Sequence, residues 1–167
     1  MRLLILILLP ALSLLLQSTL FGFYSIYGVI PDVVLIFVVV FALLHNYKQA
    51  TIYGFFCGLL EDLYVGNMIG MNALAKGLTA YIISSLQVQV FKENIIVSVL
   101  GVLLGTIFNT ALIIIIMLTV NKPLVFNVDF LWKSGFQIMY NMVLSIPAYI
   151  FYYNSTRTGW LENKGND

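Results

Sequence analysis

Two adjacent carboxylates and one lysine are the best candidates for chemistry in this otherwise apolar sequence. Glu61 and Asp62 end one apolar stretch, and Lys76 lies within the next. Such a carboxylate pair can serve acid–base catalysis or carry a cation. Adjacent side chains on a helix point about 100° apart, however, so the two carboxyl groups converge poorly on one reacting atom. We therefore do not expect an enzyme.

The other reactive side chains form no catalytic or metal-binding pattern. His45 is the only histidine and Cys57 the only cysteine. A histidine metal cluster, a thiolate cluster and an intrachain disulfide each need more of these residues, and nothing supports a Ser-His-Asp triad. The sequence predicts neither a metal ion nor another cofactor.

The composition places these residues in lipid. Hydrophobic residues make up 61% of the chain and charged residues 9%, and the formal net charge is +1. A water-soluble domain needs far more polar surface, and a balanced charge gives no reason to expect a nucleic-acid partner. We therefore expect a polytopic membrane protein.

Six apolar stretches define the expected architecture. A helix needs about 20 residues to cross the hydrocarbon core, and long continuous apolar runs favour helices over a barrel. No linker divides the chain, so we expect one all-α transmembrane domain, followed by a short cytoplasmic tail at residues 154–167. The expected spans are residues 3–21, 31–44, 49–63, 70–90, 95–120 and 134–153.

The distribution of basic residues predicts the orientation. With six spans, five Lys and Arg fall on the side of the termini and two on the other side, which favours cytoplasmic termini by the positive-inside rule. The first group is Arg2, Lys48, Lys92, Arg157 and Lys164, and the second is Lys122 and Lys133. The longest external loop is then residues 121–133, a plausible partner contact on the membrane surface.

Small and polar residues recur at four-residue spacing in five of the six stretches. In membranes, helices associate through close packing of small residues and through interhelical hydrogen bonds, so these stripes predict a compact bundle. The stripes are Ala50, Gly54, Gly58 and Asp62; Asn72, Lys76, Ala80 and Ser84; Gly101, Gly105 and Asn109; Gln137, Asn141 and Ser145; and Ser13 with Gln17.

The charged residues within the stretches need partners. Asp62 ends a helix, where the macrodipole disfavours an anion, so capping does not explain it. The side chain of Lys76 leans toward the same outer side. We expect an Asp62–Lys76 ion pair, which either holds two helices in register or contributes to partner binding. Pro31 and Asp32, by contrast, suit the first turn of their own helix.

Two segments resemble the family of the rod shape-determining protein MreD. They read "PDVVLIFVVVFALL" (residues 31–44) and "GFFCGLLEDLYVGNMIGMNALAKGLTAYI" (residues 54–82), and the match is specific from Pro31 to Tyr81. The resemblance implies a non-enzymatic component of the bacterial cell-elongation machinery in the plasma membrane. Its partner would be MreC and, indirectly, MreB and the peptidoglycan synthases. The residues expected to bind a partner or form the structural core are Pro31, Asp32, Gly54, Gly58, Asp62, Asn72 and Lys76.

The same resemblance supplies the main alternative function. Proteins of this family are similar in fold to the substrate-binding subunits of energy-coupling-factor vitamin transporters. Those subunits commonly carry an Ala-x-x-x-Ala stripe in their first helix, whereas Ala11 is followed here by Leu15. We therefore favour a scaffold that binds MreC through surfaces near the second to fourth spans. Ion conduction through Asp62 is a third, weaker hypothesis.

Overall fold

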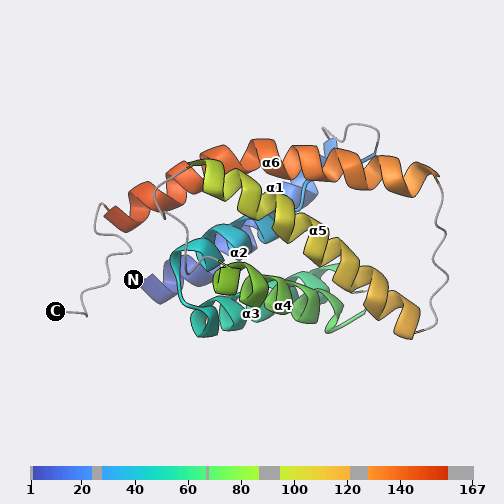
Figure 1. Cartoon of the computed structure of the whole chain (residues 1–167), viewed down its shortest axis with the longest axis horizontal. Helices are drawn as coiled ribbons and strands as arrows, with labels where there is room; N and C mark the ends of the chain where they lie inside the picture. The colour runs from blue at the N-terminus through green and yellow to red at the C-terminus, as the bar shows by residue number, and fades with distance from the viewer. Residues whose placement is uncertain (1, 24–27, 67, 87–94, 121–127, 158–167) are drawn as a thin grey trace.

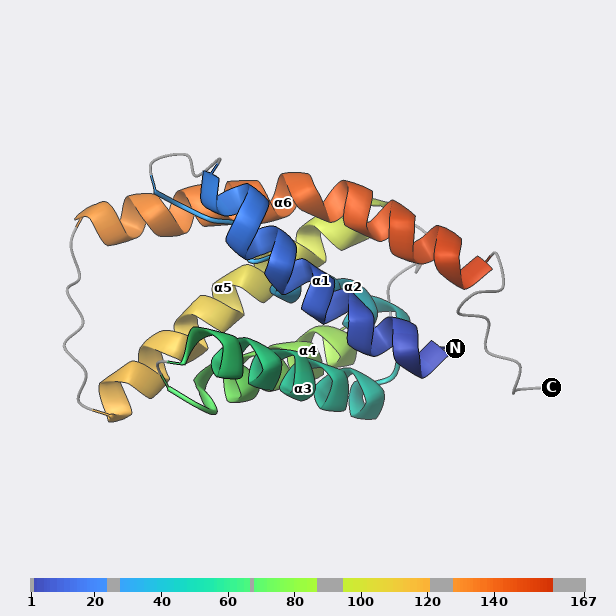
Figure 2. The ribbon, with the colours of Figure 1, turned by 180° about the vertical axis from the view of Figure 1, so that it is seen from behind.

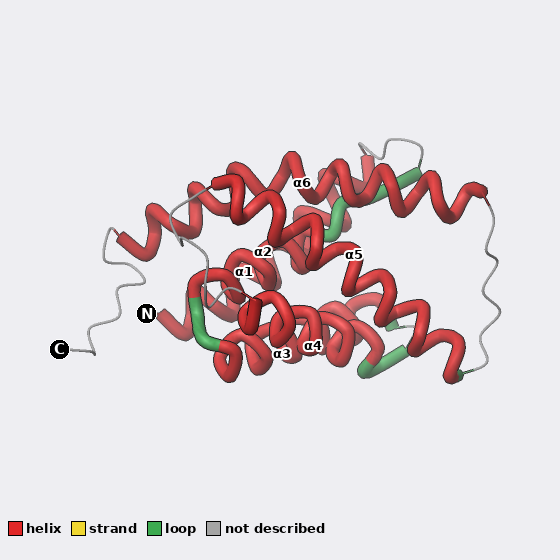
Figure 3. The backbone as a smooth tube through the Cα atoms, in the orientation of Figure 1, coloured by secondary structure: helices red, strands yellow, loops and turns green. Residues whose placement is uncertain are grey.

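The computed structural model describes residues 2–23, 28–66, 68–86, 95–120 and 128–157. Over these residues its secondary structure is helical and contains no strand, which confirms the expected all-α class (Figures 1 and 3). The helices are α1 (Arg2–Phe23), α2 (Val33–Leu44), α3 (Tyr47–Val65), α4 (Met71–Leu86), α5 (Ile95–Thr119) and α6 (Val128–Arg157).

Helix α6 differs most from its expected bounds. It begins at Val128, so Asp129 and Lys133 are helical rather than part of an external loop. Asp129 lies in the first turn, where a carboxylate interacts favourably with the positive end of the helix dipole. The expectation of a loop through residue 133 is therefore wrong for residues 128–133, whereas residues 121–127 lie outside the described part of the chain.

Helix α2 forms the centre of the bundle. It packs against each of the other helices, and ten of its twelve residues are buried (Figures 1 and 2). Its sequence is apolar on all sides, as a helix surrounded by protein requires. Because α2 presents almost no surface, any exposed surface near the second span belongs to the helices around it, and partner binding near the second to fourth spans stays a prediction.

The outer helices carry the exposed apolar surface. Large apolar side chains are exposed on α1, α3, α4, α5 and α6. Among the described residues, α5 is the one helix that is both long and apolar enough to cross a membrane by these two criteria. Leu8–Thr19 and α2 form shorter apolar helices.

Candidate functional site

Glycines bring α3 and α4 together at the candidate site. A Cβ atom added to Gly54 would lie 2.7 Å from the carbonyl oxygen of Lys76, and one added to Gly58 would lie 2.6 Å from the backbone nitrogen of Ala73. Both distances are too short for a side chain, so the two backbones can approach this closely only because these positions are glycine. The stripe from Ala50 to Asp62 is buried, as expected.

A tight reversal follows α3 and brings Asp62 to the start of α4. Gly66 ends α3 with a φ of 71°, and Gly70 has a φ of 102°. Both values lie in the left-handed region that glycine adopts without steric cost. The amide of Gly66 donates to the carbonyl of Asp62 at 2.9 Å, which closes the last turn of α3.

Asp62 caps the helix that follows it. Its Oδ1 accepts hydrogen bonds from the backbone amide of Asn72 at 3.0 Å and from Nδ2 of Asn72 at 2.9 Å. Its Oδ2 accepts from the amides of Gly70 at 2.9 Å and Ala73 at 3.1 Å. The first amides of a helix have no intrahelical acceptor, so a carboxylate here stabilises α4. Our statement that capping does not explain Asp62 considered only its own helix and is wrong.

Lys76 pairs with two other carboxylates. Its side chain is fully buried, and its Nζ lies 2.7 Å from Oδ2 of Asp32 and 2.5 Å from Oε2 of Glu61. The expected Asp62–Lys76 pair is therefore wrong. Glu61 and Asp62 point in different directions from α3, so one reaches the ammonium group and the other reaches the amides of α4.

Asp32 joins α2 to this cluster while it caps its own helix. Its Oδ1 accepts from the amide of Leu35 at 2.8 Å, which confirms the expected N-terminal role. Its Oδ2 accepts from Nζ of Lys76 at 2.7 Å. The N-cap of α2, the end of α3 and the second turn of α4 are therefore tied together by one ammonium group. We call Asp32, Glu61 and Lys76 the charged triad.

Two amide side chains extend the network to α1 and α6. Oδ1 of Asn141, which is fully buried, accepts from the amide of Asp32 at 2.9 Å, and its Nδ2 donates to Oγ1 of Thr106 on α5 at 3.1 Å. Oε1 of Gln17 accepts from the amide of Val33 at 3.2 Å. The first turn of α2 is thus held by neighbouring helices, as the polar stripes predict.

The chemistry of the triad suits helix association better than catalysis. The ammonium group of Lys76 faces two carboxylates in a buried setting, and such charges are tolerated in a protein interior only when they are paired. Glu61 Oε2 is close to Nζ but makes no well-oriented hydrogen bond. Within the described residues, no three His, Cys, Asp or Glu side chains are arranged to hold a metal ion.

All seven residues singled out in the sequence lie at or beside this junction. Asn72 is half-buried and the other six are buried, and their role in partner binding stays a prediction. Glu61 was not among them, although the sequence contained a signal for it. A carboxylate inside an apolar stretch needs a cation, and Lys76 is the lysine of the next stretch.

Exchanging the charges of Asp62 and Lys76 tests this arrangement. We expect the double variant Asp62→Lys/Lys76→Asp to be no better folded than either single variant. The new lysine would face the amide donors of α4, and the new aspartate would stand against Asp32 and Glu61. Size-exclusion chromatography of detergent-extracted protein measures the monodisperse fraction. A monodisperse fraction equal to that of the wild type in the double variant would contradict this arrangement and support the Asp62–Lys76 pair.

Comparison with protein-family models gives a match over most of the chain. A family model described as rod shape-determining protein MreD matches residues 1–155 of the 167-residue chain. No curated protein and no solved structure matches.

Proposed function

The chain belongs to the family of the rod shape-determining protein MreD, and from this premise we propose that it is a multi-pass membrane scaffold that binds MreC. In this role it would help to control cell shape and lateral peptidoglycan synthesis, with MreB and the synthases as indirect partners. The observation that carries the proposal is the family match over nearly the whole chain.

The distribution of polar and apolar groups supports the membrane part of the proposal. Polar side chains such as Lys76, Asn141 and Ser145 are buried, while large apolar side chains are exposed on the five outer helices. This is the arrangement that lipid favours, because buried polar groups hold helices together and exposed apolar groups face hydrocarbon. Six spans with both termini in the cytoplasm also agree with the distribution of basic residues.

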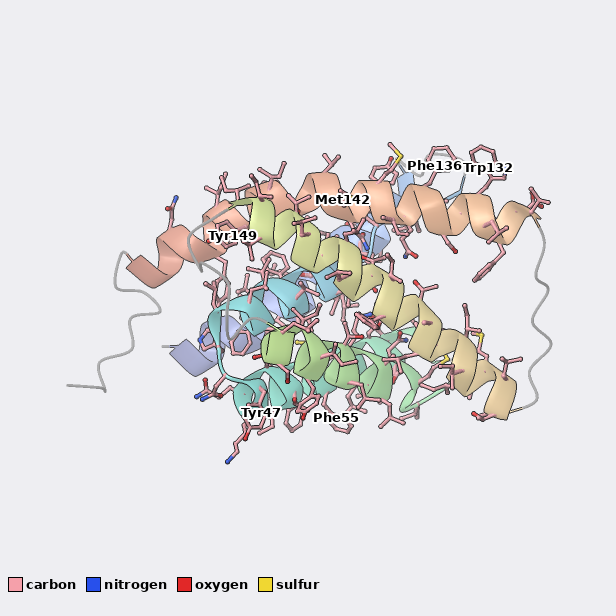
Figure 4. All side chains as sticks on the ribbon, in the orientation of Figure 1. Tyr47, Phe55, Trp132, Phe136, Met142 and Tyr149 are labelled. Carbon is pink, nitrogen blue, oxygen red and sulfur yellow. The ribbon has the colours of Figure 1, made fainter. Side chains whose placement is uncertain are left out.

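The outer face of α3 and α4 is the surface we assign to MreC. It carries exposed apolar side chains on both helices, among them Phe55, Leu74, Leu78 and Tyr81. Figure 4 shows Phe55 on the side of this helix pair that faces away from α5 and α6. Gly77 is buried beside Phe55 and allows α4 to pack closely against α3 beneath this face.

Co-purification with MreC tests this assignment. We expect Leu74→Ala/Leu78→Ala to lower the recovery of MreC about tenfold, since losing 1.4 kcal/mol of association weakens binding by that factor. The measurement is the ratio of MreC to tagged protein after extraction in mild detergent.

The matched control is Met139→Ala/Val143→Ala on α6. These two apolar residues have the same spacing along their helix and are 63% and 65% exposed, against 52% and 46% for Leu74 and Leu78. Equal loss in both double variants would contradict docking on α3 and α4. Recovery of a tightly bound vitamin or a transporter coupling subunit in place of MreC would overturn the scaffold function itself.

A further inference from the structure

The first turns of α6 extend beyond the length that a membrane span needs. Thirty residues of α-helix measure about 45 Å, whereas the hydrocarbon core is about 30 Å thick. The apolar stretch expected to span begins at residue 134, so Val128 to Lys133 lie at the level of the lipid headgroups in the proposed topology. The placement of this segment at the headgroup level follows from the length of α6 and does not depend on MreC binding.

One face of this segment lines an open pocket of about 420 Å³. Its lining includes Asp129, Trp132, Lys133 and Phe136, which share a helical face because they are three or four residues apart. The rings of Trp132 and Phe136 stack with their centroids 6.1 Å apart. Figure 4 shows both rings on the side of α6 that faces away from α3 and α4.

The two charges of this face have no protein partner in the described part of the chain. Asp129 and Lys133 are exposed and one turn apart, yet the ion pairs found there are those of Lys76 alone. Four residues of helix place Lys133 about 6 Å deeper along the axis than Asp129. From the headgroup level inward, the face therefore presents an anion, then a cation beside an indole, then a phenyl ring.

We propose that this face binds a zwitterionic phospholipid whose headgroup carries a primary ammonium, as in phosphatidylethanolamine. In such a lipid the ammonium is outermost, the phosphate lies deeper and the acyl chains lie deepest, which is the order of Asp129, Lys133 and Phe136. Asp129 accepts hydrogen bonds from the ammonium, and Lys133 pairs with the phosphate. The indole of Trp132 sits at the interface between headgroups and acyl chains.

This chemistry discriminates among lipids. Phosphatidylglycerol carries no cation, so Asp129 repels its headgroup or is left unpaired. Phosphatidylcholine carries a quaternary ammonium that has no N–H to donate to the carboxylate of Asp129. The soluble headgroup phosphoethanolamine has both charges but lacks the chains that contact Trp132 and Phe136. The face should therefore prefer the intact ethanolamine lipid to all three.

Quenching of Trp132 fluorescence tests the proposal. The chain has two tryptophans, so a Trp160→Phe background leaves Trp132 as the sole reporter. Full-length protein in detergent micelles is titrated with brominated phosphatidylethanolamine, phosphatidylcholine or phosphatidylglycerol, without MreC. We expect half-maximal quenching by the ethanolamine lipid at about a tenfold lower mole fraction than by either other lipid, and no displacement by phosphoethanolamine.

The charge-exchanged variant Asp129→Lys/Lys133→Asp is the matched control, because it keeps the net charge and alters two exposed residues. We expect the exchanged variant to raise the mole fraction of ethanolamine lipid at half-maximal quenching about tenfold. We expect Asp129→Asn alone to remove the preference for the ethanolamine lipid over phosphatidylcholine. Equal midpoints for the three lipids, an unchanged midpoint in the exchanged variant, or displacement by phosphoethanolamine would each overturn the site. None of these results bears on MreC binding.

Discussion

Lys76→Met is expected to lower the thermal unfolding midpoint of the detergent-extracted protein by roughly 10 °C, or to abolish folding. The substitution removes the one cation that faces Asp32 and Glu61 and leaves two carboxylates in a buried site. Removing one partner of a buried ion pair typically costs about 3–5 kcal/mol, a large share of the stability of a domain. Midpoints are read from the loss of the monodisperse peak after heating.

Removing all three charges should reverse most of this loss. In Asp32→Asn/Glu61→Gln/Lys76→Met, no uncompensated charge remains, and buried ion networks can often be replaced by neutral side chains at little cost. Lys48→Met, at an exposed position on α3, is the control and should leave the midpoint unchanged. A triple variant as unstable as Lys76→Met would show that the charges themselves, and not their balance, hold the helices together.

Among the Gly→Ala substitutions at the described glycines, we expect Gly58→Ala to destabilise the protein most. The new Cβ would overlap the backbone of Asn72 and lie 2.6 Å from the backbone nitrogen of Ala73. Backbone atoms cannot move aside as a flexible side chain can, so α4 must separate from α3. Overpacking costs about 1–3 kcal/mol and sometimes more, and we expect a loss of at least about 3 kcal/mol because Asp62 caps α4 at this place.

Gly135→Ala and Gly77→Ala are the controls for this variant. No atom lies within 4 Å of a Cβ at Gly135, and the nearest atom to one at Gly77 is 3.4 Å away. Both glycines are inside helices, so alanine should preserve stability or raise it by about 0.5–1 kcal/mol. A thermal unfolding midpoint for Gly58→Ala within 2 °C of these controls corresponds to a stability difference of at most roughly 1 kcal/mol. Such a result would show that α3 and α4 are not in such close contact.

The close approach of α3 and α4 could be predicted from the sequence because it depends on a simple period. Gly54 and Gly58 are four residues apart, and this spacing places both on one helical face whatever the exact position of the helix. The same reasoning identified Asn141 and Gln17 as interhelical contacts, which the structure confirms. Residue type and spacing are therefore sufficient to predict these interhelical contacts.

The partners of the charges could not be predicted in the same way. Glu61 and Asp62 are neighbours, and a rotation of α3 by about 100° would exchange their surroundings. The rotation of α3 depends on its packing, chiefly against α4, and the residues of α3 alone do not reveal which carboxylate that packing brings to Lys76. Our pairing also joined Lys76 to a single carboxylate on a neighbouring helix and so overlooked Asp32, which is distant in sequence but adjacent in the bundle.

The extent of α6 differs from the prediction and the burial of α2 was not predicted, and both differences have physical causes. The extent of α6 was underestimated because Asp129 and Lys133 interrupt the apolar run, although charged residues are common where a helix leaves the hydrocarbon. The central position of α2 could have been predicted, since a helix that is apolar on all sides is suited to the centre of a bundle as well as to lipid.

The most direct test of the central claim is co-purification of MreC with the neutral triple variant Asp32→Asn/Glu61→Gln/Lys76→Met. If the charged triad belongs to the interior of the bundle and takes no part in partner recognition, the folded triple variant keeps the outer face of α3 and α4 and recovers MreC at the wild-type ratio. A triple variant that is monodisperse at the wild-type level but loses MreC would contradict the claim, because the triad would then take part in partner recognition.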